Sequence, residues 1–78
     1  MSIEKLVRKG REAELRQELV KLDALVDDEL TALQMRLLPS YDPWEYDADA
    51  IERHAAALVK YIRRAKEIKR KLEELENG

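Results

Sequence analysis

Apolar residues recur along residues 15–37 at steps of three and four, and this periodicity limits the fold more than any other feature of the chain. The positions are Leu15, Leu19, Leu22, Val26, Leu30, Leu33 and Leu37. Their mean spacing of about 3.7 residues is close to one turn of an α-helix, so all of them lie on one face. The pattern predicts one long amphipathic helix through this part of the chain.

Two prolines mark the connection between this helix and a second one. Pro39 ends the first helix, because proline has no N–H and disfavours helical geometry in the residue before it. Residues 42–45, Asp-Pro-Trp-Glu, place an acceptor at a helix N-cap, proline at the first helical position and glutamate three residues after the cap. We therefore expect a helix over about 2–38, a turn over about 39–42 and a helix over about 43–76. A start at Asp47, with residues 39–46 as a longer loop, is the alternative.

A seven-residue repeat runs through the second helix. One set comprises Trp44, Ile51, Leu58, Ala65 and Leu72, and the other comprises His54, Tyr61, Ile68 and Leu75. Such a repeat is typical of helices that pack side by side with a left-handed twist. The short connection and the matching apolar faces favour a chain that folds back on itself. The sequence predicts an all-α fold in which residues 1–78 form one antiparallel, coiled-coil-like two-helix hairpin, with the numbers of facing residues summing to about 80.

The composition agrees with this fold and excludes others. The chain has two Gly and two Pro, too few turn residues for a β-sandwich, a β-barrel or a multi-loop α/β fold. It has no Cys, which excludes a disulfide scaffold, a thiolate metal site and a cysteine nucleophile. We see no signal-peptide core and no apolar run long enough to span a membrane, so we expect a cytoplasmic protein that does not contact membranes.

Further apolar residues lie outside the two packed faces. They are Val20, Ala24, Met35 and Leu38 on the first helix and Ala55, Val59 and Ile62 on the second. A core of this size seldom supplies more than about 3–5 kcal/mol, and one hairpin cannot cover these flanks. We expect a homodimer that forms a four-helix bundle with two-fold symmetry, with these residues in its interface. The alternative is a different helical protein that completes the bundle.

Charge is divided unevenly along the hairpin. Residues 23–52 carry nine acids and one base, whereas the rest of the chain carries eight acids and fourteen bases. The turn end is therefore acidic and the open end is basic. One interpretation is a solvated surface whose halves differ. The other is an arrangement that orients partners or attracts a polyanion to the basic end.

Two clusters are candidate binding sites. Tyr41, Trp44 and Tyr46 crowd the turn, where they either cover the helix ends or present a partner-binding surface that favours a basic partner. Basic side chains on the second helix could contact nucleic acid, although glutamates alternate with them and no aromatic residue stands among them to stack a base. The candidates for this polyanion contact are Arg63, Arg64, Lys66, Lys69 and Arg70. A solvated helix surface with ion pairs between successive turns is the alternative.

The sequence offers no support for catalysis. His54 is the single histidine, and its place in the repeat favours a core residue over a ligand. Ile51 stands where a di-metal bundle would need the glutamate of a Glu-x-x-His pair. We find no nucleophile triad, phosphate-binding loop or zinc-binding helix motif, so we expect no enzyme activity, no cofactor and no metal.

The architecture resembles that of the Rop family, small dimeric helical hairpins that bind RNA. The turn over residues 39–43, Pro-Ser-Tyr-Asp-Pro, is similar to the Pro-Ser-x-Pro turn of type III secretion needle subunits, which are also helical hairpins, with one residue inserted. We expect a small protein–protein interaction or adaptor module that acts as a dimer. The alternative, implied by the first resemblance, is an RNA-binding regulatory dimer that uses its basic open end.

Overall fold

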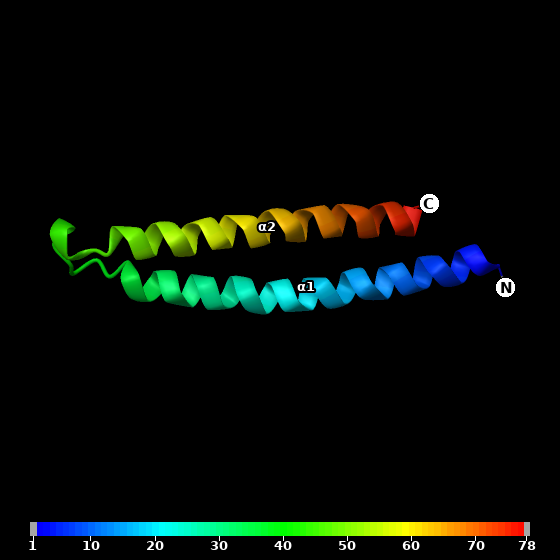
Figure 1. Cartoon of the computed structure of the whole chain (residues 1–78), viewed down its shortest axis with the longest axis horizontal. Coiled ribbons are helices and arrows are strands. Elements are labelled where there is room, and N and C mark those ends of the chain that lie inside the picture. Colours follow the sequence, from blue (N-terminus) through cyan, green and yellow to red (C-terminus); the bar gives the residue numbers. More distant parts are fainter. Residues whose placement is uncertain (1, 78) are drawn as a thin grey trace.

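Two long helices packed side by side make up nearly the whole molecule. The computed structural model describes residues 2–77. Helix α1 spans Ile3–Arg36, a single 3₁₀ turn, η1, spans Pro43–Glu45, and helix α2 spans Ala48–Asn77. They form an extended hairpin that measures 64 × 16 × 15 Å, with both chain termini at the end opposite the connecting loop (Figure 1). The expected all-α antiparallel hairpin is confirmed.

Helix α1 begins and ends on local hydrogen bonds. The Ser2 hydroxyl accepts a hydrogen bond from the backbone N–H of Lys5 at 3.3 Å, the usual arrangement of an N-cap. At the other end, the N–H of Leu37 donates to the carbonyl of Leu33 at 2.9 Å. The helix stops at Arg36, two residues before the expected end, because Leu38 precedes Pro39 and proline disfavours helical geometry there.

The expected start of the second helix at residue 43 is wrong, and the alternative start at Asp47 is the one observed. Residues Pro43–Glu45 form only the turn η1, and the side chain of Asp42 makes no capping hydrogen bond. The carboxylate of Asp47 instead accepts from the N–H of Ala50 at 3.0 Å, and its carbonyl accepts from Ile51 at 3.0 Å. Tyr46 is extended between the two segments, so the loop is several residues longer than the expected turn over 39–42.

The core is a narrow line of apolar contacts between the helices. Its centre is a cluster of Leu15, Leu22, Ile68 and Leu72, against which Leu19, Tyr61, Ala65 and Leu75 pack. The seven-residue repeat predicted for α2 therefore describes its packed face, except at Trp44, which lies outside α2 and is 81% exposed. The six buried residues of the described chain are Leu15, Leu22, Leu33, Ala50, Ile68 and Leu72.

The two helices pair in a register slightly different from the expected one. The interhelical pairs Glu29–His54 and Glu18–Arg64 join residues whose numbers sum to 83 and 82, rather than about 80. The longer loop moves the start of α2 along α1 and so shifts the register. Leu30 and Leu37, both expected on the packed face, are exposed, and Glu29 takes the inner position instead.

Candidate interaction surfaces

An open apolar groove runs between the helices on one flank of the hairpin. Its volume is about 470 Å³, and its floor consists of apolar side chains from both helices. Asp23 lies at its edge on α1, and Lys66 and Lys69 lie at its edge on α2. The apolar residues that line it are Leu19, Leu22, Val26, Ile62 and Ala65. The hairpin thus leaves part of its own core accessible from this side.

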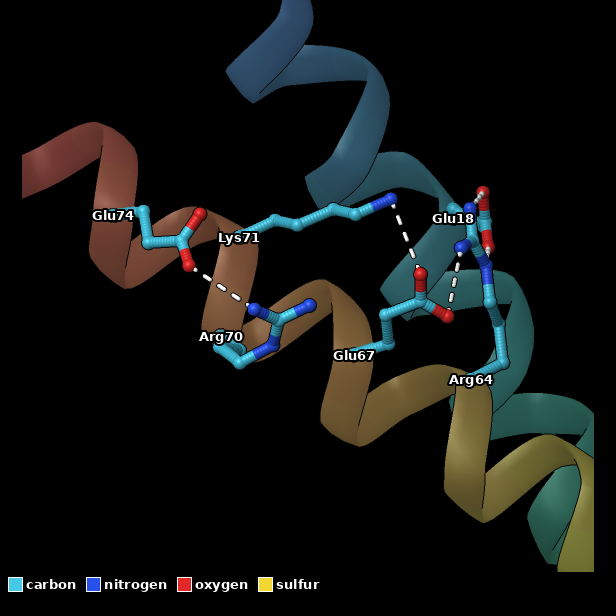
Figure 2. A network of polar contacts seen from close by, with 6 residues as sticks. All are labelled: Glu18, Arg64, Glu67, Arg70, Lys71 and Glu74. Atoms are coloured by element: carbon cyan, nitrogen blue, oxygen red, sulfur yellow. Dashed lines mark hydrogen bonds and ion pairs between the residues drawn. The ribbon is translucent and has the colours of Figure 1, made fainter.

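The opposite flank carries a network of ion pairs. Arg64 of α2 donates two hydrogen bonds to the Glu18 carboxylate of α1, at 2.5 and 3.1 Å. Glu67 contacts both Arg64 and Lys71 at 3.3 Å, which links one turn of α2 to the next. Figure 2 shows this network, together with the separate pair of Arg70 and Glu74. A second depression of about 470 Å³ borders Glu18, Arg64 and Lys71 on this flank, so the two flanks differ in their lining: charged side chains here and mainly apolar ones in the groove.

These contacts change the acidity of the groups involved. The hydrogen bonds from Arg64, and then its charge, lower the pKa of Glu18 below its usual 4.5. Lys71, followed by Arg64, lowers the pKa of Glu67 in the same way. The hydrogen bond to Glu18 raises the pKa of Arg64 above its usual value. Each shift favours the charged form, so the network is an ion-pair network at neutral pH.

His54 lies in the packed face, as expected for a core histidine, and its partner is Glu29. The His54 Nδ1 atom lies 2.7 Å from the Glu29 Oε2 atom, and the two side chains are 25% and 21% exposed. This polar pair interrupts the apolar line between α1 and α2. Within residues 2–77, no three histidine, cysteine or acidic side chains are placed to hold a metal ion.

The three aromatic residues of the loop have different roles in the structure. The rings of Tyr41 and Tyr46 meet edge to face, with centroids 5.6 Å apart. The Tyr46 hydroxyl donates to the carbonyl of Leu38 at 2.7 Å, which holds the loop against the end of α1. Trp44 lies between the two tyrosines in the sequence, in η1, and its side chain is largely exposed. The interpretation that Trp44 starts the packed face is therefore wrong. We call Tyr41, Trp44 and Tyr46 the aromatic tip.

The five candidate polyanion contacts do not lie together in the structure. Arg64 is paired with Glu18 and Glu67, and Arg70 is paired with Glu74. Lys66 and Lys69 lie at the edge of the apolar groove, and Arg63 is exposed beside Arg64. The five residues are therefore spread around α2 instead of forming one basic face. RNA binding at the open end stays a prediction.

Three of the proposed interface residues lie along the groove side of α2. Ile62 lines the groove, and Ala55 and Val59 precede Ile62 and Lys66 by seven residues and so lie on the same side of α2. The other four proposed residues lie elsewhere: Val20 and Ala24, one turn apart, on the outer face of α1, Met35 opposite Val26 on the helix, and Leu38 in the loop.

Sequence reasoning overlooked two interhelical contacts, Glu29–His54 and Glu18–Arg64. A signal for Glu29 was present, because it follows Leu22 by seven residues, as Leu22 follows Leu15. Two helices that twist around each other share one repeat, so the 3.5-residue period of α2 applies to α1 as well. On that period Glu29, and not Leu30, belongs to the packed face. Glu18 and Arg64 carried no comparable signal.

Comparisons of the chain with protein-family models, curated proteins and solved structures found no match. Neither helix, over the part of the chain described, combines the length and the apolar character needed to cross a membrane. Any functional conclusion therefore depends on the surfaces of this chain itself.

Proposed function

We propose that this chain is a non-enzymatic protein–protein interaction module that acts as a dimer of helical hairpins. The observation that carries the proposal is the open apolar groove around Val26, Ile62 and Ala65. A second helical surface that fills the groove would remove the accessible part of the core from water, which is the main favourable contribution to protein association.

The small size of the core supports the same conclusion. Six residues of the described chain are buried, and only four of them form a shared cluster between the helices. Small helical proteins with so little buried surface usually gain stability from a further element, a metal or a partner.

We assign the binding of other proteins to the aromatic tip. Internal contacts of Tyr41 and Tyr46 fix the loop, so Trp44 is held outward without covering any part of the hairpin. Exposed tryptophan on an ordered loop is a typical anchor of protein interfaces. Acidic residues surround it in the sequence, namely Asp42, Glu45, Asp47 and Asp49, and they favour a basic partner.

Sedimentation equilibrium tests the dimer. We expect the native chain to sediment with twice the mass of one chain, and we expect Ile62→Glu to weaken the dimer at least about tenfold, because each copy would bury a carboxylate in the groove. Met35→Glu is the matched control, since Met35 is 69% exposed and lies on the opposite side of α1 from Val26. Equal masses for both variants, with unchanged helical content, would contradict a groove-mediated dimer.

Tryptophan fluorescence tests the tip, because Trp44 is the only tryptophan. We expect Trp44 emission to shift to shorter wavelength when a lysine- and arginine-rich amphipathic peptide is added. The shift should shrink in Asp42→Asn/Glu45→Gln, which keeps the reporter. Trp44→Ala should change the free energy of unfolding by less than about 0.5 kcal/mol, because the side chain is exposed. Emission that stays typical of water with the peptide in excess would contradict a basic partner at this site.

A further inference from the structure

We propose that the second copy of the chain lies antiparallel across the groove, so that the two aromatic tips occupy opposite ends of the dimer. The inference rests on the proposed function, because it assumes that the groove is the dimer interface. It adds the orientation of the two hairpins, which an apolar groove alone does not determine.

The order of residues along the groove side of α2 indicates how the two hairpins are oriented relative to each other. Glu52, Val59 and Lys66 follow one another at steps of seven residues, so they lie in one line on that side of the helix. Because Lys66 lies at the edge of the groove, the line runs along that edge. Over residues 52–66 the line therefore reads acid, apolar, base toward the open end, and Glu73 follows at the next step. Ala55, Ile62 and Lys69 form the neighbouring line, which continues to Glu76, the partner of Arg16.

A line with an acid at one end and a base at the other pairs favourably with a reversed copy of itself, because each acid then faces a base. A two-fold axis that passes near Val59, perpendicular to the helix, places the Lys66 of one copy opposite the Glu52 of the other. Both residues are seven positions, about 10 Å at 1.5 Å per residue, from Val59. A parallel dimer would instead place Glu52 against Glu52 and Lys66 against Lys66, and like charges that face each other are unfavourable.

The charged residues of this flank are not engaged within the hairpin. None of the ion pairs among residues 2–77 involves Glu52, Lys66, Lys69 or the neighbouring Asp27. On the opposite flank, Glu18, Arg64, Glu67 and Lys71 pair with one another. The charged side chains beside the groove are thus free to pair with a second copy, and their order over residues 52–66 matches a reversed one.

The antiparallel arrangement has a functional consequence. The aromatic tip lies at the turn end of each hairpin, so an antiparallel dimer presents one tip at each end of a rod (Figure 1). Such a dimer can bridge two partner molecules, whereas a parallel dimer would offer both tips to the same partner surface.

Spin-label distances test the orientation. The chain has no cysteine, so Ser40→Cys introduces a single thiol in the exposed loop. We expect inter-label distances of at least about 35 Å, since roughly twelve residues of helix separate the loop from the Val59 level in each copy. In a parallel dimer the two labels would lie within about 20 Å of each other, because packed helices are 8–10 Å apart.

Charge reversal provides an independent test. Glu52→Lys should raise the dimer dissociation constant about tenfold, because two attractive contacts become repulsive, and Glu52→Lys/Lys66→Glu should restore it. In a parallel dimer, Glu52→Lys would merely exchange one like-charge contact for another. Inter-label distances within about 20 Å, or a dimer dissociation constant that Glu52→Lys leaves unchanged, would overturn the antiparallel orientation. Neither result would contradict the dimer itself. A monomer at every concentration would overturn both proposals.

Discussion

Glu29 and His54 place a polar pair where the repeat of both helices would allow two apolar side chains. Their contact of 2.7 Å joins α1 to α2, and both side chains are mostly shielded from water. Removing one member of such a pair lowers the free energy of unfolding, because the remaining polar group stays shielded from water without a hydrogen bond. Replacing both partners with apolar residues avoids that cost.

This asymmetry gives a prediction for three variants. Removing one partner, in Glu29→Leu or His54→Leu, should lower the free energy of unfolding by about 1 kcal/mol or more. The double variant Glu29→Leu/His54→Leu should be at least as stable as the native chain, since two leucines extend the apolar line. Urea unfolding at neutral pH, followed by circular dichroism, measures all four proteins. A double variant less stable than both single ones would contradict this description of the pair.

The same residues explain why sequence reasoning placed α1 only approximately. A spacing of about 3.7 residues describes a straight helix, and it selects Leu30 and Leu37 for the packed face. The structure exposes both and turns Glu29 inward, because α1 follows the 3.5-residue repeat of its partner. Upstream of Val26 the two patterns coincide, and there the predicted residues Leu15, Leu19 and Leu22 do pack against α2.

At the scale of whole helices, Glu18, Arg64, Glu67 and Lys71 form the network that ties α1 to α2 on one flank. Its side chains keep contact with water, and Arg64 and Glu18 are 39% and 38% exposed. Solvent and salt therefore screen these pairs, and their contribution to stability is smaller than their geometry alone suggests.

The network predicts how stability changes in acid. The pKa values of Glu18 and Glu67 are lower in the folded chain than their usual 4.5, so the unfolded chain binds protons first as the pH falls. Their contribution is complete above about pH 4.5 and is lost progressively below it. Urea midpoints between pH 7 and pH 3 should therefore fall less steeply in Glu18→Gln/Glu67→Gln than in the native chain. Parallel curves for the two proteins would contradict the assignment.

The start of α2 shows the limit of local sequence signals. Residues 42–45 carry the residues of a capping box, yet Asp47 supplies the cap. Two acceptor residues five positions apart compete for the same role, and contacts distant in sequence decide between them. Arg36 at the end of α1 reaches Asp47 at 3.4 Å, and Tyr46 bonds to Leu38. Neither contact could be predicted before the position of α1 was known.

On the scale of the whole molecule, the fold class and the packed face of α2 could be predicted, because periodicity and a short connection determine them. The groove and the aromatic tip could not be predicted, because their shape depends on contacts that only the folded chain brings together. Ile62 was predicted as an interface residue, but the sequence did not show that it borders an open groove with Lys66 and Lys69. Nor did it show that Trp44 is held outward by the contacts of its tyrosine neighbours.

The central claim is that one hairpin exposes more apolar helix surface than it can bury and that a second copy covers this surface. Thermal unfolding of the native chain across a hundredfold range of concentration tests it most directly, because dimerisation links the melting temperature to concentration. We predict that the melting temperature rises steadily with concentration. A sharp transition at one fixed temperature, in samples that sediment as single chains, would contradict the claim.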